Sequence, residues 1–340
     1  MNSFGEKFRL EIFGESHGPA VGIVLDGVPA GIHLEEDDFL EDIGRRSPAS
    51  YPAGSTSRHE KDIPKIVSGV FEGTATGAPL CIIFDNADTD PDSDAEYARY
   101  VHIPRPGHAD FTAAFKYGHH YDMRGGGQFS GRMTLPLVAA GVVAKKIISP
   151  MLPSASLLSI GGEDLSKCAD EKSVSEAVSR AVGKATSEGD SIGGTVRCIC
   201  DGVPAGLGEP FFDSVESEIS HLVFSIPGAR GIEFGAGFAS AGMKGSQCND
   251  PFTDGKGSTA TNNCGGINGG ITNGNRLSFD VAFKPPSSIA KVQRTFDFHT
   301  GKIEDFSVKG RHDVCFALRT PVIVEACCTC VLADLMLRNR

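Results

Sequence analysis

A six-residue segment that occurs twice constrains the fold more than any other feature of the chain. Asp-Gly-Val-Pro-Ala-Gly stands at 26–31 and again, letter for letter, at 201–206. The match continues upstream at the same spacing, where the corresponding pairs are Gly14 and Gly189, Glu15 and Asp190, Ser16 and Ser191, and Gly18 and Gly193. A repeat of this kind predicts two related structural units that pack on each other.

The two copies are also flanked by similar segments of sequence. Each follows a short apolar run and precedes a candidate amphipathic helix, 36–46 in the first copy and 213–224 in the second, where Asp213 and Glu216 have capping-box spacing. The histidine of the first copy is not repeated, since His17 corresponds to Ile192. Any chemistry carried by this segment is therefore expected in the first copy.

The remaining pattern mixes helices and strands without strict alternation. Candidate strands lie at 65–71, 80–84, 276–283 and 315–318, and candidate helices lie at 133–148, 173–187 (with a capping box at Ser173 and Glu176) and 321–337. A doubly wound parallel sheet is therefore not favoured. We expect an α+β fold, a pseudo-two-fold duplicated βαβ sandwich with helices between antiparallel sheets. It forms a single domain, 1–340, with halves at about 1–150 and 151–340.

Composition excludes several classes of protein. The net charge is −11, the opposite of the basic field that nonspecific nucleic-acid binding needs. No apolar run approaches the ~18 residues that a membrane-spanning helix requires, and the first residues are polar, so a cytoplasmic location is expected. Among the ten cysteines, Cys327 and Cys330 have C-x-x-C spacing. Core packing is expected there, with redox or metal use as the alternative.

Glycine is enriched, at 42 of 340 residues, and gathers near histidine, arginine and aspartate. The segments concerned are Phe-Gly-Glu-Ser-His-Gly at 13–18, Arg-Pro-Gly-His-Ala-Asp at 105–110, Arg-Gly-Gly-Gly-Gln-Phe-Ser-Gly-Arg at 124–132, and Lys-Gly-Arg-His-Asp at 309–313. The third leads into a candidate helix, and a glycine-rich loop at a helix N-terminus is typical of an anion site. Ordinary polar loops, a glycine hinge or a turn remain the alternatives for each segment taken singly.

Taken together, these segments place arginine, the residue best suited to bidentate capture of phosphate or carboxylate, beside His17 and His108. Both histidines are candidates for general acid or base catalysis. A metal site at His119 and His120 is disfavoured by the spacing. The residues alone thus predict an enzyme for a small polyanionic, phosphate-bearing substrate.

The four segments, in this order, resemble the chorismate synthase family. The runs at 26–31, 202–210 and Lys-Pro-Pro-Ser-Ser at 284–288 are also similar to that family, and the resemblance extends from Phe8 to Leu335. It implies a lyase that converts 5-enolpyruvylshikimate 3-phosphate to chorismate and phosphate by 1,4-anti elimination, the last common step of aromatic amino acid biosynthesis. It also implies reduced FMN from an external source, a connection with NADP, and a homotetramer.

The resemblance also implies roles for individual residues. His17 would donate a proton to the departing phosphate, His108 would govern flavin protonation, and Asp313 with Ser16 would support the flavin nitrogen that receives the substrate hydrogen. Substrate anions would be bound by Arg46, Arg105, Arg132 and Arg311. FMN would be held by Gln128, Phe129, Ser130, Gly269, Lys284, Pro285, Pro286, Ser287, Ser288 and Arg311.

Three departures from the family pattern accompany the resemblance. Gln128 and Phe129 replace two residues of the usual Arg-Ser-Ser-Ala-Arg run, and Pro227-Gly228 replaces the usual Asn-Ala. An arginine expected shortly after Pro48 is missing, and Arg58 is the candidate replacement. The alternatives to the lyase are a noncatalytic sensor that kept the pocket and a flavin-independent phosphatase.

Overall fold

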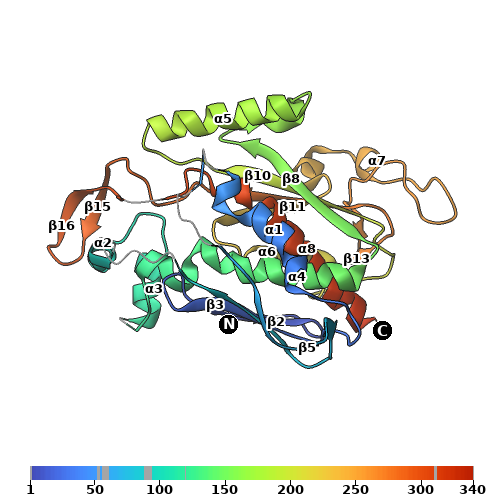
Figure 1. The fold of residues 1–340 in the computed structure, drawn as a ribbon. Coiled ribbons are helices and arrows are strands. Elements are labelled where there is room, and N and C mark those ends of the chain that lie inside the picture. Colours follow the sequence, from blue (N-terminus) through green and yellow to red (C-terminus); the bar gives the residue numbers. More distant parts are fainter. Residues whose placement is uncertain are drawn as a thin grey trace.

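The computed structural model describes residues 2–51, 54–55, 61–87, 94–118, 120–309 and 312–339. Within these ranges the chain forms two five-stranded sheets with a layer of helices between them (Figure 1). The strand order is β1-β2-β3-β7-β4 in the N-terminal sheet and β11-β14-β10-β8-β9 in the C-terminal sheet, and the paired strands of both are antiparallel. The expected α+β fold with helices between antiparallel sheets is confirmed.

The strands are short, as is usual for sheets of this kind. The N-terminal sheet contains β1 (Ser3–Phe4), β2 (Arg9–Gly14), β3 (Ala20–Asp26), β4 (Lys65–Ser68) and β7 (Leu80–Asp85). The C-terminal sheet contains β8 (Leu152–Ile160), β9 (Glu163–Asp164), β10 (Gly194–Asp201), β11 (Ala229–Phe234) and β14 (Leu277–Phe283). Separate hairpins are formed by β5 (Val70–Phe71) with β6 (Thr74–Ala75), β12 (Ile267–Asn268) with β13 (Ile271–Thr272), and β15 (Gln293–Asp297) with β16 (Lys302–Phe306).

The helices between the sheets contribute a large part of the core. They are α1 (Leu40–Arg46), α4 (Thr134–Ile148), α6 (Val215–Val223) and α8 (Pro321–Arg338). Because α4 and α8 are apolar on nearly all sides, they are buried along almost their whole length. The other helices are α2 (Asp94–Arg99), α3 (Asp110–Tyr117), α5 (Glu171–Ser187) and α7 (Gly245–Cys248). The 3-10 helices are η1 (Glu36–Phe39), η2 (Pro48–Ser50), η4 (Arg124–Phe129), η5 (Gly131–Met133), η6 (Leu165–Lys167), η7 (Gly237–Gly242) and η8 (Phe316–Arg319).

The two sheets have the same connectivity in their four main strands. In each, the first two strands in the chain pair, the third lies at an edge, and the fourth lies between the second and the third: β2-β3-β7-β4 and β8-β10-β14-β11. Helices α1 and α6 follow the second strand, and α4 and α8 follow the fourth. Helix α5 has no counterpart in the first half and lies outside the C-terminal sheet (Figure 1).

The two copies of the repeated hexapeptide form matching turns after β3 and β10. The amide of Gly31 donates to the carbonyl oxygen of Ala75 at 2.9 Å, and the amide of Gly206 donates to that of Thr272 at 2.9 Å. The first residue of each copy pairs with an arginine, Asp26 with Arg9 and Asp201 with Arg276. From this connectivity, and from a hydrophobic core that contains residues of both sheets, we infer one domain built of two halves that meet near residue 150.

Three local expectations were wrong by small amounts. Residues 316–319 form η8 instead of a strand, because this segment turns directly into the proline that begins α8. The N-cap of α5 is Asp170, whose Oδ1 accepts the amide of Ser173 at 2.8 Å. The N-cap of α6 is Ser214, one residue later than expected.

The clustered cysteines lie in the core, as expected for Cys327 and Cys330. Cys198 and Cys200 on β10 and Cys327, Cys328 and Cys330 on α8 are fully buried. Within the described ranges, no group of three or more His, Cys, Asp or Glu side chains is arranged to hold a metal ion. No helix there combines the length and the apolar character needed to cross a membrane.

The buried carboxylate of Asp334 joins α8 to the N-terminal segment and supplies a stability test. It accepts the backbone amides of Glu6 (3.1 Å), Lys7 (2.6 Å) and Phe8 (2.8 Å), and Arg338 Nε donates to it at 2.9 Å. Asp334→Ala leaves these donors without an acceptor, so we expect a loss of about 3–5 kcal/mol in the free energy of unfolding, measured by urea denaturation.

The control is Asp305→Ala, which removes an exposed carboxylate on β16 that lies 3.9 Å from Arg294. An exposed pair of this kind contributes only about 0–1 kcal/mol. Equal urea midpoints for the two variants would contradict the role assigned to Asp334.

Candidate active site

A cavity of about 610 Å³ opens where the ends of the central helices meet. Arg132 in η5 and Arg319 in η8 line it, and these segments lead directly into α4 and α8. Arg46, the last residue of α1, and Phe224, which follows α6, complete this part of the wall. The N-termini of two buried helices therefore lie next to the cavity, and helix N-termini favour bound anions.

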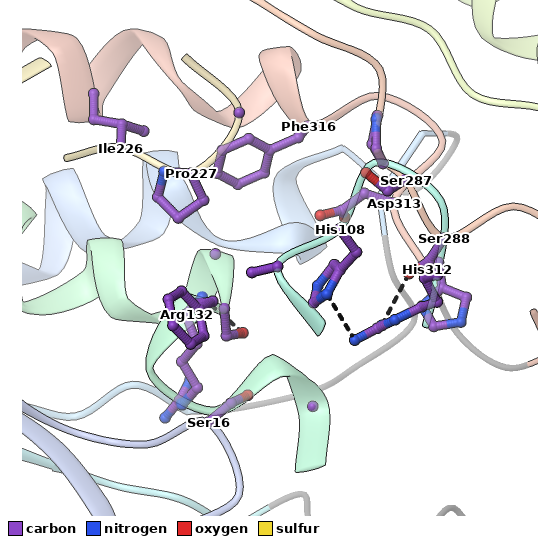
Figure 2. Close-up of a pocket in the computed structure, with 18 of the residues that line it drawn as sticks. Ser16, His108, Arg132, Ile226, Pro227, Ser287, Ser288, His312, Asp313 and Phe316 are labelled. Atoms are coloured by element: carbon purple, nitrogen blue, oxygen red, sulfur yellow. Dashed lines mark hydrogen bonds between the residues drawn. The ribbon is translucent and has the colours of Figure 1, made fainter. Parts of the chain in front are cut away.

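Nearly all site residues expected from the sequence line this cavity (Figure 2). They are Ser16, His17, Arg46, Arg105, His108, Gln128, Phe129, Ser130, Arg132, Lys284, Pro285, Pro286, Ser287, Ser288 and Asp313. Pro227 and Gly228, which replace the usual Asn-Ala, also line it. Gly269 does not; it lies in the tight turn between β12 and β13 with φ +62°. Arg311 and Arg58 lie outside the described residues.

The glycine triplet at 125–127 separates the two histidines. All three residues have positive φ angles, a backbone that side chains rarely adopt. A Cβ at Gly125 would lie 2.5 Å from Cδ2 of His17, and one at Gly126 would lie 3.7 Å from Nε2 of His108. Glycine is therefore required for the loop to pass this close to His17, and the loop touches both rings.

Asn86 holds the turn that carries His17. Its Nδ2 donates to the carbonyl oxygens of Glu15 (2.9 Å) and Gly18 (2.7 Å), on either side of the histidine. Its Oδ1 accepts from Nε of Arg132. One amide side chain therefore fixes His17 relative to a buried guanidinium.

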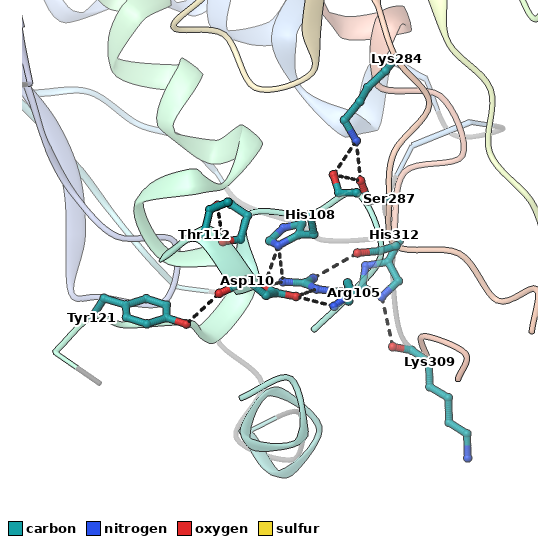
Figure 3. A network of polar contacts seen from close by, with 12 residues as sticks. Arg105, His108, Asp110, Thr112, Tyr121, Lys284, Ser287, Lys309 and His312 are labelled. Atoms are coloured by element: carbon teal, nitrogen blue, oxygen red, sulfur yellow. Dashed lines mark hydrogen bonds and ion pairs between the residues drawn. The ribbon is translucent and has the colours of Figure 1, made fainter. Parts of the chain in front are cut away.

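Arg105, His108 and Asp110 form a buried polar cluster (Figure 3). Arg105 donates to both oxygens of Asp110, from Nε at 2.7 Å and from Nη2 at 2.8 Å, and Nδ1 of His108 lies 2.6 Å from Oδ1. Burial alone would raise the pKa of Asp110, but the hydrogen bonds from Arg105 and His108 outweigh it and hold that pKa well below its usual range. Asp110 is thus ionised and accepts only.

This cluster defines the state of His108. Because Asp110 is ionised, the Nδ1–H of His108 donates to it, and the neutral ring presents the lone pair of Nε2 on its opposite side, where Gly126 lies. Burial lowers the pKa of His108 below 6.5, and the Asp110 carboxylate offsets this only in part. His108 is therefore a neutral base at pH 7.

Lys284 and Ser287 bind the loop that carries His108. Lys284 Nζ donates to the carbonyl oxygen of Gly107 at 3.0 Å and contacts Ser287 Oγ, which itself donates to Gly107 at 2.7 Å. Ser288 Oγ accepts from Nη1 of Arg105 at 3.1 Å. The 284–288 run thus reaches the cavity from the second half and meets the histidine loop of the first.

Two residues that the sequence analysis did not identify, Asp62 and Arg319, also line the cavity. Asp62 is buried between two guanidiniums, at 2.9 Å from Nη1 of Arg132 and 3.5 Å from Nη1 of Arg46. Arg319 donates from Nη2 to Asp313 at 2.6 Å. One feature of the sequence could have identified Arg319: it stands two residues before α8, just as Arg132 stands two residues before α4. No such feature marks Asp62.

The fold and the cavity together indicate an enzyme that binds a small polyanion, and comparison with known proteins identifies its family. The chorismate synthase family model matches residues 8–337. The chain is 53% identical over 337 residues to the chorismate synthase of Chitinophaga pinensis, covering 99% of this chain and 97% of the relative. It is 42% identical over 356 residues to that of Korarchaeum cryptofilum, with 99% and 97% covered. The chain therefore belongs to the chorismate synthase family.

A solved structure described as chorismate synthase has the same fold, with a TM-score of 0.73, 24% identity, and coverage of 98% of this chain and 93% of that one. The lyase class, the place in the shikimate pathway and the need for a reduced flavin, all expected from the sequence, follow from membership of the family. Its relatives give no support to the sensor or phosphatase alternatives.

The contact between Gly125 and His17 can be tested with one methyl group. Gly125→Ala places a Cβ against the His17 ring, and displacement of a reacting group by about 1 Å can cost ~10²-fold in rate. We expect turnover per folded molecule to fall at least about tenfold. The matched control is Gly162→Ala, which has φ +89° but no atom within 4 Å of the added Cβ. Equal turnover in the two variants would rule out the contact.

The low pKa of His108 predicts a pH dependence of stability. In the unfolded chain the ring takes up a proton near pH 6.5, whereas in the folded chain it does so only at lower pH. The unfolded state then binds more protons, so the free energy of unfolding decreases as pH falls below about 6.5. His108→Gln removes this contribution, and urea titrations between pH 7.5 and 5.5 should show a shallower slope for the variant. A steeper slope would mean that the folded state favours the charged ring.

Proposed function

We propose that this cavity binds 5-enolpyruvylshikimate 3-phosphate beside reduced FMN and converts it to chorismate and phosphate by 1,4-anti elimination. The observation that carries the proposal is the glycine loop at 125–127, which lies beside both His17 and His108 within a cavity lined by buried arginines. The reaction breaks one carbon–oxygen bond, removes one ring hydrogen and releases phosphate. It therefore needs anion binding, a proton donor and a base.

We propose that a flavin and the substrate share this cavity. Its volume of about 610 Å³ lies within the usual range of ~300–1,000 Å³ for ligand and cofactor sites. Ser130, Lys284, Ser287 and Ser288 bring hydroxyl and ammonium groups to its lining, and Gln128 adds an amide. Bound reduced FMN would supply electron density for the cleavage and is not consumed. Gly269 does not belong to this lining, so its expected FMN contact has no support within one chain.

Anion binding is assigned to the buried guanidiniums. Arg46 and Arg132 flank Asp62, and burial, with the guanidiniums of Arg319 and Arg132, lowers the pKa of Arg46 to about 9. An arginine in this state gains from a nearby negative charge. Phosphate and carboxylate groups of the substrate provide that charge.

Arg105 binds Asp110 with Nε and Nη2 and Ser288 with Nη1. We infer that Arg105 contributes positive charge to the cavity and orients His108.

His17 is proposed as the proton donor to the departing phosphate. It lies in the turn fixed by Asn86, whose other end binds Arg132, so a proton and a positive charge reach the same part of the cavity. General acid catalysis of this kind contributes about 10²–10⁴-fold.

His108 is proposed to hold or release a proton at Nε2 next to the reduced flavin. Ser16 and Asp313 are proposed to orient the same group. Asp313 is suited to this because Arg319 fixes its carboxylate.

Assembly and supply complete the proposal. We propose a homotetramer in the cytoplasm, supplied with reduced FMN, and so connected to NADP, by a separate reductase.

The function is tested by an anaerobic assay with dithionite-reduced FMN. We expect chorismate and phosphate in equal amounts with reduced FMN, and neither product without it. Phosphate release in the absence of flavin would show a phosphatase, and binding without turnover would show a sensor.

Single variants distinguish the roles of the two histidines. His17→Ala should slow phosphate release by about 10²–10⁴-fold without altering the absorbance of bound reduced FMN. His108→Ala should change that absorbance, because it removes the group proposed to control flavin protonation. Both roles are refuted if each variant keeps normal turnover per folded molecule and a normal spectrum.

A further inference from the structure

Five charged residues meet at one end of the cavity, four of them buried and one, Asp313, partly buried. Three are guanidiniums, Arg46, Arg132 and Arg319, and two are carboxylates, Asp62 and Asp313. The three arginines are 3%, 6% and 5% exposed. The five residues lie close together, since the charges of the other four all influence the pKa of Arg46. With two carboxylates against three guanidiniums, the cluster holds one positive charge in excess.

Arg132 and Arg319 occupy corresponding places in the two halves. Arg132 lies in η5, two residues before α4 begins, and Arg319 lies in η8, two residues before α8 begins. Each donates to one aspartate, Arg132 to Asp62 at 2.9 Å and Arg319 to Asp313 at 2.6 Å. The duplication has therefore placed an arginine–aspartate pair at the N-terminus of each buried helix.

The two arginines differ in how many donors they use. All three nitrogens of Arg132 donate, Nε to Asn86, Nη1 to Asp62 and Nη2 to the carbonyl oxygen of Asp85. Within the described ranges, Nη2 of Arg319 has a hydrogen-bond partner, whereas Nε is buried and has none. A buried donor without an acceptor costs about 1–3 kcal/mol.

The position of Arg319 is nonetheless fixed. Its guanidinium lies over the ring of Phe316, 5.1 Å from the centroid, and Nη2 is anchored to Asp313. Phe316 and Asp313 both line the cavity with it (Figure 2). A fixed, buried cation with an unused donor beside a cavity is the arrangement expected where a ligand supplies the missing acceptor.

We propose that Arg319 is a substrate-binding residue, whose guanidinium binds an oxyanion of the substrate, carboxylate or phosphate, while Nη2 holds Asp313. The inference rests on the proposed function, since the substrate is 5-enolpyruvylshikimate 3-phosphate. It adds a second-half partner to Arg46 and Arg132. The substrate is thereby bound from both halves of the chain.

The test measures binding by calorimetry on the full chain without turnover. The variants are Arg319→Lys, which keeps the charge but loses the planar fork, and Arg319→Gln, which loses both. The control is Arg276→Gln, which removes an exposed arginine paired with Asp201 outside the cavity. We expect the dissociation constant of 5-enolpyruvylshikimate 3-phosphate to rise roughly tenfold to hundredfold for both Arg319 variants and to stay unchanged for the control.

A second ligand, shikimate 3-phosphate, identifies the anion. It lacks the enolpyruvyl carboxylate, so loss of binding for the full substrate alone assigns that carboxylate to Arg319. Loss for both ligands assigns the phosphate or the ring carboxylate. Either result supports the proposal.

A purely structural role gives a different result. In that case the Arg319 variants melt at lower temperature, but the folded fraction binds both ligands with unchanged dissociation constants, which overturns the inference. If the unaltered chain binds neither ligand, the proposed function itself fails. The two failures are therefore distinguishable.

Discussion

The site depends on the pairing of buried arginines with carboxylates. A guanidinium removed from water is tolerated only where an opposite charge and hydrogen-bond acceptors replace the lost hydration. The pairs are Arg105 with Asp110, Arg132 with Asp62, and Arg319 with Asp313. Through them, a chain with a net charge of −11 maintains a positively charged cavity. The same aspartates orient the arginines and, through Asp110, set the protonation of His108.

Much of this arrangement could be predicted from the sequence, because short local patterns of residues determine it. The repeated hexapeptide indicated the duplication, and apolar periodicity located α4, α5 and α8 to within a few residues. Glycine beside histidine and arginine marked the segments that line the cavity. Such signals are short-range, since a turn or a helix is determined mainly by neighbouring residues.

The rest could not be predicted, because it depends on contacts between residues far apart in the chain. Asp62 and Asn86 lie in segments without a motif, and only the fold brings them to Arg132. The segment at 315–318 was predicted as a strand from its apolar residues, but residues 316–319 form a helical turn that leads into the proline at the start of α8. Gly269 was assigned to FMN by resemblance; it lies in the turn between β12 and β13, outside the cavity lining of the same chain, and its role stays a prediction. Local composition does not carry this information.

The two similar halves contribute unlike segments to the cavity. His17 of the first half lines it, whereas Ile192, which corresponds to His17 in the second half, does not. The turn with His17 thus comes from one half, and Lys284 and Asp313 come from the other. Because the cavity is lined by different groups on its different sides, it presents an unsymmetrical substrate with one matching direction of entry.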